Sequence, residues 1–322
     1  MESEGGAVHH RPSGHTVMSL STASGDPIAD RRFAIAAALA GDGDLAAATD
    51  VLGQALELAP TWAAGWLRLG EWRERMGDAA GAASAYARAR TLDSGDVLGA
   101  GLRLAALAGA TPGTMPAAYV AALFDDYAPR FDAALTGKLA YRTPALLADL
   151  LGRIAGDRRF SVALDLGCGT GLMGEVLRAR VDHLAGVDLA PRMVAAAARK
   201  AVYARLATGD ALAFLDAEPA ASADLVVAAD MLPYVGDAVP LLAAAARVLA
   251  PGGFLAVSAE RADGAATLLG PALRYRHPPA VLAEAAARAG LAVRATEPAV
   301  LRTEAGRPVE GFLLVAELPG PG

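Results

Sequence analysis

A glycine-rich turn that directly follows an apolar run is the feature that most constrains the fold of this chain. Val162–Leu166 is apolar except for Asp165, and the eight residues after it contain four glycines. These are Gly167, Gly169, Gly171 and Gly174. Glycine permits positive φ angles and lets a ligand approach bare main chain. The sequence therefore predicts a strand, a ligand-binding turn and a helix, in that order.

The chain after residue 116 alternates strand-like apolar runs with helical patterns. Helical periodicity is clearest at Arg192–Lys200, Pro240–Leu249 and Ala280–Ala289. The predicted strands are Val162–Leu166, Leu184–Asp188, Ala204–Thr208, Leu225–Ala229, Phe254–Ala259, Leu291–Thr296 and Phe312–Glu317. This alternation predicts an α/β fold with a largely parallel sheet covered by helices on both faces. Ligands of such sheets bind outside the carboxyl ends of the strands, where the glycine turn lies.

An alanine-rich helical region with an internal repeat comes before this α/β region. The pair Gly43-Asp44 recurs 34 residues later as Gly77-Asp78. Four further pairs, Ala36 with Gly70, Ala48 with Ala82, Leu52 with Tyr86 and Ala55 with Ala89, keep the same spacing. A period of this length predicts paired helices that stack on one another.

These patterns divide the chain into four parts. Residues 1–26 mix Gly, Ser, His and Pro without periodicity and are predicted to be a disordered tail. His9, His10 and His15 belong to this tail, so we expect no metal site. Residues 27–109 form the helical repeat region, the turn-rich residues 110–116 form a linker, and residues 117–322 form the α/β domain.

Charge and cysteine content limit the partners and the compartment. The formal net charge is −6, and a chain without basic excess is not suited to hold a phosphate backbone, so we expect no nucleic-acid partner. Cys168 is the single cysteine, which fits a reducing cytoplasm. Pro112, Gly113 and Pro116 interrupt the uncharged stretch from Leu104 to Phe124, so we expect no membrane span.

Several segments of the α/β region together resemble class I S-adenosylmethionine-dependent methyltransferases. The run Asp165-Leu-Gly-Cys-Gly-Thr-Gly resembles the first motif of that family, and four later segments resemble its further motifs. Those segments are Leu184–Ala197, Thr208–Leu212, Asp224–Asp237 and Leu249–Glu260. The resemblance covers about Tyr119 to Leu318. It implies a Rossmann-like seven-stranded sheet whose last two strands, Leu291–Thr296 and Phe312–Glu317, form an antiparallel hairpin around a loop.

The same resemblance implies S-adenosylmethionine as the cofactor and assigns its binding residues. They are Asp165, Gly167, Cys168, Gly169, Gly171, Asp188, Leu189, Asp210, Ala211 and Asp230. Asp188 would accept the ribose hydroxyls, Asp210 the adenine amino group, and the Ala211 N–H would meet a ring nitrogen. Asp210 also has the position of a helix N-cap, and the two roles can coexist. The loop lacks Lys and Arg, which fits a cofactor without phosphate.

Residues for the methyl acceptor are less well defined. Tyr119, Phe124, Tyr127, Arg130 and Phe131 lie on a segment that resembles the lid helix of small-molecule methyltransferases, or that packs on the sheet edge as an ordinary amphipathic helix. The candidate catalytic residues are His277, Tyr234 and Asp230. His277 titrates near neutrality and is suited to accept a proton, although it also fits an ordinary surface loop. The run from Asp230 to Tyr234 departs from the N-P-P-Y signature of amino-methylating members.

The helical repeats resemble the tetratricopeptide repeat. The residues that support this resemblance are Trp66, Leu69 and Gly70 in one predicted helix and Tyr86 in the next. The sequence contains two full repeat units and a partial third, Val97–Leu107. They are predicted to form either a structural cap or self-association surface, or a groove that binds a protein partner.

The predicted function is methyl transfer to an oxygen or nitrogen of a small molecule or of a recruited protein. Two alternatives remain open: an inactive scaffold, and an NAD(P)-dependent oxidoreductase, because Gly169–Gly174 also matches G-x-G-x-x-G.

Overall fold

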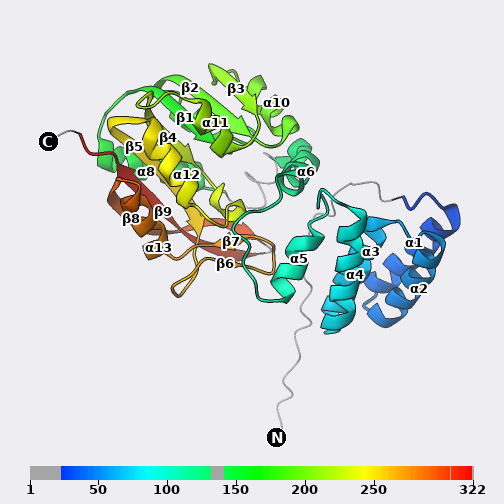
Figure 1. Ribbon diagram of the computed structural model, residues 1–322. Coiled ribbons are helices and arrows are strands. Elements are labelled where there is room, and N and C mark those ends of the chain that lie inside the picture. Colours follow the sequence, from blue (N-terminus) through cyan, green and yellow to red (C-terminus); the bar gives the residue numbers. More distant parts are fainter. Residues whose placement is uncertain (1–22, 132–140, 305, 321–322) are drawn as a thin grey trace, which may run out of the picture.

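A computed structural model describes residues 23–131, 141–304 and 306–320 (Figure 1). The helices are α1 (Pro27–Gly41), α2 (Leu45–Leu58), α3 (Ala63–Arg75), α4 (Ala79–Leu92), α5 (Ala100–Leu107), α6 (Ala117–Tyr127), η1 (Ala128–Arg130), α8 (Thr143–Ala155), α9 (Leu172–Leu177), α10 (Pro191–Arg199), α11 (Ala211–Ala217), η3 (Leu232–Tyr234), α12 (Val239–Val248) and α13 (Pro279–Arg288). The strands are β1 (Phe160–Leu166), β2 (Val181–Asp188), β3 (Arg205–Thr208), β4 (Ala223–Ala228), β5 (Leu249–Glu260), β6 (Leu268–Leu269), β7 (Tyr275–Arg276), β8 (Ala292–Glu304) and β9 (Arg307–Glu317). Most of the predicted tail, residues 1–22, lies outside the described ranges. No helix in the ranges described combines the length and apolar character needed to cross a bilayer.

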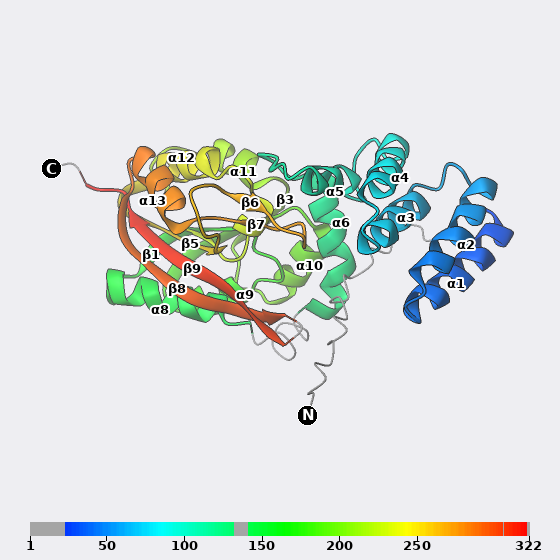
Figure 2. The same ribbon diagram turned by 90° about the horizontal axis from the view of Figure 1, so that it is seen from below.

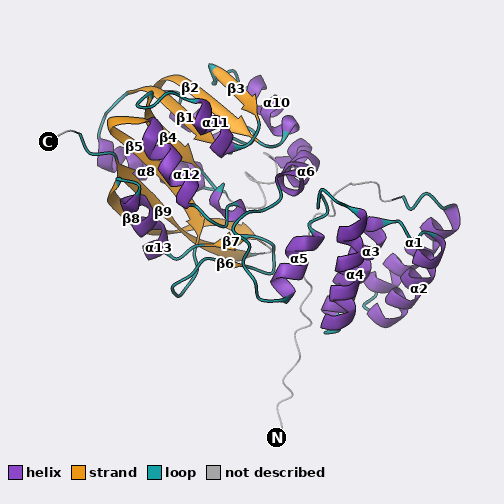
Figure 3. Cartoon of the chain, in the orientation of Figure 1, coloured by secondary structure: helices purple, strands orange, loops and turns teal. Residues whose placement is uncertain are grey.

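The repeat region consists of helices alone, as Figure 3 shows. Its second and fourth helices, α2 and α4, begin 34 residues apart, as the sequence period predicts. Before each one, a glycine with positive φ turns the chain and an aspartate caps the helix: the Asp44 carboxylate accepts from the Ala47 N–H, and that of Asp78 from the Gly81 N–H. The repeated Gly-Asp pair is therefore a turn followed by an N-cap.

Close helix packing explains the other repeated positions. A Cβ at Gly70 would lie 2.4 Å from the Tyr86 ring, so only glycine lets α3 approach α4 there. The buried Tyr86 hydroxyl donates to Glu74 at 2.6 Å. At the other end of the region, the Phe33 ring lies 5.1 Å from that of Trp62 and 6.3 Å from that of Trp72, between centroids. Aromatic side chains thus fill the space between the helices, and a glycine makes room for one of them.

The α/β part is built on a seven-stranded sheet with the order β3-β2-β1-β4-β5-β9-β8. The first five strands pair in parallel, and β9 runs antiparallel between β5 and β8. The order reverses direction between β1 and β4, which places a ligand-binding crevice at their carboxyl ends. This largely parallel sheet with flanking helices agrees with the Rossmann-like arrangement that the sequence predicts.

Helices cover both faces of this sheet (Figure 2). One core contains residues of α11, α12 and α13, and the other contains residues of α8 and α9. The central strands β1 and β4 are almost wholly buried, which is why they read as continuous apolar runs.

The last hairpin corrects one prediction. The sequence predicts strands that end at Thr296 and resume at Phe312, but β8 continues to Glu304 and β9 begins at Arg307. The segment between contains Pro298 and several charged residues, a composition typical of loops. These residues are tolerated because β8 is the edge strand of the sheet, where a proline costs no ladder bond and alternate side chains face solvent.

The third repeat unit and the predicted linker both pack against the α/β part. Leu102 of α5 shares an apolar cluster with Tyr119 of α6 and Tyr275 of β7. In the segment 110–116, Thr114 forms a β-bridge with Val235, and the Gly113 carbonyl accepts from the Asp237 N–H at 2.7 Å. The segment is therefore held against the loop after β4 rather than forming a free spacer.

Gly99 tests this contact between the two regions. It has a φ of 73°, and a Cβ there would lie 2.7 Å from the Tyr119 ring. We expect Gly99→Ala to lower the free energy of unfolding by about 2–4 kcal/mol, which combines left-handed strain with overpacking. Denaturant titration followed by circular dichroism measures the change.

Gly109→Ala is the matched control. Gly109 also has a positive φ, 65°, but a Cβ there would meet nothing within 4 Å. It should cost only the strain, about 1 kcal/mol. Equal losses in the two variants would show that the Gly99–Tyr119 contact contributes nothing.

Candidate functional site

The glycine turn leaves the carboxyl end of β1 with an unusual backbone. Gly167, Gly169 and Gly171 have φ values of 65°, 54° and 90°, all in the left-handed region that side chains disfavour. The space over Gly169 is open, since the nearest atom to a Cβ there would be the Phe131 ring at 3.9 Å. A ligand that lies over Gly169 therefore meets bare main chain.

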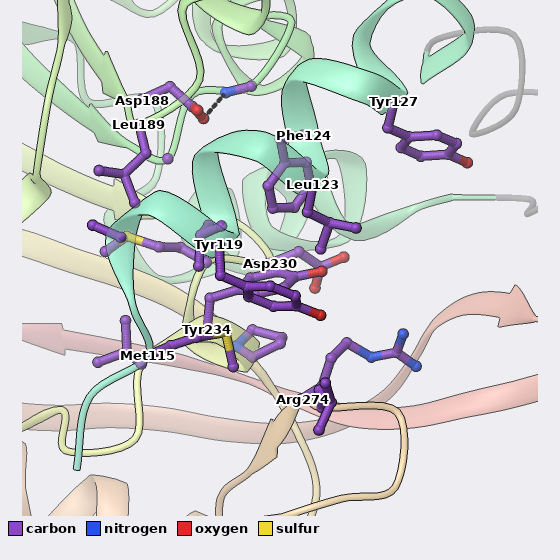
Figure 4. Close-up of a pocket in the computed structure, with 18 of the residues that line it drawn as sticks. Met115, Tyr119, Leu123, Phe124, Tyr127, Asp188, Leu189, Asp230, Tyr234 and Arg274 are labelled. Carbon is purple, nitrogen blue, oxygen red and sulfur yellow. Dashed lines mark hydrogen bonds between the residues drawn. The ribbon is translucent and has the colours of Figure 1, made fainter. Parts of the chain in front are cut away.

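Asp188, at the end of β2, holds this turn in place. One of its carboxylate oxygens accepts from the Gly169 N–H at 2.9 Å, and the other accepts from the Ala190 N–H at 2.8 Å. Burial raises the pKa of Asp188, and the two N–H donors oppose that rise. The carboxylate lies at the edge of the cavity in Figure 4, as does the adjacent Leu189. Asp188 thus connects the second strand to the loop of the first.

Asp165 is buried beneath the same loop. Its carboxylate accepts a hydrogen bond from the Tyr203 hydroxyl at 2.6 Å. Burial raises the pKa of Asp165 to about 7, against the lowering effect of the Tyr203 hydrogen bond. The neighbouring Cys168 is buried, and burial raises the pKa of its thiol well above the ordinary value, which fits a small filler rather than a nucleophile. No sequence pattern points to Tyr203, because its contact with Asp165 joins residues 38 positions apart and forms only on folding.

Asp210 caps α11, as its position in the sequence predicts. Its carboxylate accepts from the N–H groups of Leu212 and Ala213 at 2.9 and 3.0 Å. Asp210 and Ala211 also line the cavity, next to the carboxyl end of β3. The N-cap and the cavity position coexist.

A single cavity of about 880 Å³ connects these groups to the rest of the molecule. The glycine turn, Asp165, Asp188 and Asp210 line one end of it. Its walls then pass along α6 and the 113–115 segment to Phe33, Trp62 and Arg68 of the repeat region. The cavity is therefore bounded by both parts of the protein.

The predicted lid residues lie together on one wall. Tyr119, Phe124, Tyr127 and Phe131 all line the cavity, and the first three are labelled in Figure 4. Phe124 contacts Phe131 and Tyr234 edge-on, with centroids 6.2 and 5.0 Å apart, and Tyr127 contacts Phe131 at 5.3 Å. Arg130 ends η1, and its side chain lies outside the described part. The helix also packs on its neighbour, since Asp125 accepts from the Arg192 N–H at the start of α10.

Asp230 lies where β4 ends and has a φ of 55°, a strained value for a residue with a side chain. Its N–H donates to the Ser258 hydroxyl at 2.8 Å, and its Oδ2 lies 3.5 Å from Nη1 of Arg302. Burial raises the pKa of Asp230, while the Arg302 charge lowers it. Asp230 lines the cavity and is labelled among its lining residues in Figure 4.

Asp230 belongs to a cluster of charged residues. The cluster also contains Arg274, Arg302, Glu260 and Glu304, which the sequence analysis did not identify as a group. Arg302 pairs with the buried Glu260, and Arg274 contacts Glu260 at 2.7 Å and Glu304 at 2.5 Å. Arg302 and Glu304 lie in the segment predicted as loop, so nothing indicated that they would face β5. Both guanidinium groups of this cluster therefore have carboxylate partners.

The two remaining catalytic candidates are placed differently. Tyr234 lines the cavity, and burial raises its pKa to about 12. His277 does not line the cavity: it is only 2% exposed, with Nε2 3.1 Å from the Leu232 carbonyl and Nδ1 3.2 Å from the Thr267 hydroxyl. Burial lowers its pKa. Because His277 does not line the cavity, this placement argues against the proton-accepting role that the sequence suggests. Because the residue is buried, it is also not an exposed side chain of a surface loop.

Comparisons with known proteins bear on the chemistry of this site. Residues 164–257 match a family model described as a methyltransferase domain. A ubiquinone biosynthesis O-methyltransferase of Xylella fastidiosa is 34% identical over 109 residues, which are 33% of this chain and 44% of the relative. A trans-aconitate 2-methyltransferase of Methylobacterium nodulans is 39% identical over 131 residues, 39% of this chain and 48% of the relative. The chain thus spans less than half the length of these curated relatives.

One similar solved structure is 1,6-didemethyltoxoflavin-N1-methyltransferase of Burkholderia thailandensis, with bound 1,6-didemethyltoxoflavin and S-adenosylhomocysteine. It is 19% identical, covers 65% of this chain and 92% of its own, and has a TM-score of 0.49. The matched segment 164–257 contains the glycine turn, Asp188, Asp210 and Asp230. Residues 164–257 are thus similar to a methyltransferase domain, and the mostly parallel seven-stranded sheet with flanking helices is consistent with a Rossmann-like methyltransferase fold.

Proposed function

We propose that this protein transfers a methyl group from S-adenosylmethionine to an oxygen or nitrogen of an acceptor held against α6. The observation that carries this proposal is the end of the cavity formed by three left-handed glycines and the carboxylates of Asp165 and Asp188. Around that turn the described lining residues include no lysine or arginine. This set suits a nucleoside with an amino group and hydroxyls, and does not suit a pyrophosphate.

Each carboxylate has a distinct part in this proposal. Asp188 accepts the ribose hydroxyls, Asp165 faces the amino group of the methionine end, and Asp210 with the Ala211 N–H meets the adenine. The loop glycines and Leu189 supply close contact with the nucleoside. The cofactor supplies an electrophilic methyl on a sulfonium, and the protein's main task is to hold the acceptor in line with it.

The acceptor side is formed by Asp230, Tyr234 and the aromatic residues of α6. Aromatic rings at Phe124, Tyr127 and Phe131 suit a flat or apolar acceptor body and exclude water from the methyl group. Asp230 lines the same cavity, and its raised pKa makes it suited to accept a proton from an acceptor hydroxyl or amine. His277 has no part in this mechanism because it does not reach the cavity.

The repeat region contributes the far end of the cavity, so an acceptor larger than the lid pocket would contact Trp62 and Arg68. The 34-residue spacing of α2 and α4, with their shared cap, supports the assignment of these helices as tetratricopeptide repeats. We propose that they bind part of the acceptor or a partner that presents it, in the cytoplasm. The methyltransferases among the relatives do not favour an oxidoreductase or an inactive scaffold.

Asp188→Ala tests the cofactor site. Loss of both oxygens removes the ribose contact and releases the Gly169 and Ala190 N–H groups, so we expect the affinity for S-adenosylmethionine to fall more than tenfold, measured by titration calorimetry. Asp182→Ala is the control, since Asp182 lies on the same strand but pairs with Arg159 at the opposite end. Unchanged affinity in Asp188→Ala would refute the ribose role.

Methyl transfer itself is tested with methyl-labelled S-adenosylmethionine and a cell extract. We expect label to enter a small metabolite or a protein with the wild type and to be lost with Asp188→Ala. In a parallel thermal-shift experiment, S-adenosylmethionine should raise the melting temperature and NAD should not. Stabilisation by NAD alone, or cofactor binding without any transfer, would favour the oxidoreductase or the scaffold respectively.

A further inference from the structure

Tyr203 lies behind the glycine turn, outside the cavity, on the segment between α10 and β3. Its hydroxyl donates to Oδ2 of Asp165 at 2.6 Å. Asp165 in turn lines the cavity from the other side of the turn. The Tyr203 hydroxyl thus reaches the cavity through the Asp165 carboxylate.

Three glycines make room for the Tyr203 ring. A Cβ at Gly171 of the turn, Gly174 of α9 or Gly186 of β2 would lie 3.0, 2.6 and 2.8 Å from atoms of Tyr203. Contacts below 3.0 Å are closer than side chains tolerate, so Gly174 and Gly186 can be replaced only if the ring moves. Glycine at these positions therefore serves the tyrosine as well as the turn. The ring is held from three elements, which fixes the direction of its hydroxyl.

Without the Tyr203 hydroxyl as a donor, the surroundings of Asp165 disfavour its ionised form. Its side chain is almost fully buried, with the residue 1% exposed. The titratable groups that face it are the Tyr203 phenol, the Asp188 carboxylate, the Cys168 thiol and the Tyr141 phenol, and none is a base. Burial and Asp188 raise the pKa of Asp165 to about 7, and the Tyr203 hydrogen bond is the one contribution that lowers it.

We propose that Tyr203 is a positioning residue for cofactor binding, which holds the Asp165 carboxylate ionised and turned toward the amino group of S-adenosylmethionine. This inference rests on the proposed function, and in particular on Asp165 facing that amino group. Removal of the hydroxyl removes the donor but keeps the ring in its three-glycine socket. The carboxylate then ionises only at higher pH, so the affinity for S-adenosylmethionine falls below that of the wild type near neutrality and approaches the wild-type value at higher pH.

The test compares wild type with Tyr203→Phe by titration calorimetry from pH 6 to pH 9, with two probes. S-adenosylmethionine carries the amino group, and 5′-methylthioadenosine has the same nucleoside without it. We expect Tyr203→Phe to weaken S-adenosylmethionine about fivefold at pH 7 and less than twofold at pH 9, which is the effect of raising one carboxyl pKa by about one unit. The ratio of the wild-type affinity to the Tyr203→Phe affinity at each pH cancels the titration of the cofactor's own amino group, because the ligand is the same for both proteins. Affinity for methylthioadenosine should be unchanged.

Tyr86→Phe is the matched control, because it removes a buried tyrosine hydroxyl that donates to Glu74 in the repeat region. It should alter neither affinity. If Tyr203→Phe does not fold, the wild type still tests the inference: its affinity for S-adenosylmethionine, relative to methylthioadenosine, should rise from pH 6 to pH 7.5. A flat ratio there would overturn it.

The outcomes separate the two proposals. Wild type that binds neither probe would overturn the proposed function. Wild type that binds both, with a Tyr203→Phe defect equal at every pH or equal for both probes, would overturn only the positioning role, because a purely structural tyrosine would weaken both ligands alike. In an Asp165→Asn background, Tyr203→Phe should have no further effect on the affinity for S-adenosylmethionine.

Discussion

The candidate site depends on the path of the main chain between β1 and α9. Three successive left-handed glycines bend the chain so that its N–H groups face the end of β2, where the Asp188 carboxylate accepts one of them. A side chain at position 169 would occupy the open space over the turn, where the nearest atom to a Cβ is the Phe131 ring at 3.9 Å. The parallel sheet places these strand ends at a common edge, and the turn converts that edge into a site.

The acids of this site are held at some cost to stability. Asp165 and Asp188 are both buried, and burial raises the pKa of each. For a carboxyl whose folded-state pKa is raised, the stabilising contribution is complete at low pH and is lost as pH rises through the folded value. The folded domain therefore opposes ionisation of these two acids, and hydrogen bonds from Tyr203, Gly169 and Ala190 offset part of that opposition.

Much of this arrangement was visible in the sequence, because its signals are local. The buried strands, the glycine turn and the acids at the strand ends lie within a few residues of one another, and the repeated Gly-Asp pair marks a turn and cap that form within one helix start. Contacts between distant segments gave no such signal. The Asp230–Arg302 pair joins residues 72 positions apart, and Tyr203 reaches Asp165 across 38. The burial of His277, which the sequence places at the surface, depends in the same way on the Leu232 carbonyl 45 positions away.

The aromatic packing of the repeat region has a practical consequence. All three tryptophans of the chain, Trp62, Trp66 and Trp72, belong to the first helix of the second repeat or the turn before it. Tryptophan fluorescence of the intact protein is therefore an optical probe of the repeat region, while ligand titration senses the α/β part. Recording both signals on one sample during denaturation would reveal whether the halves melt together or in sequence, without any label or truncation.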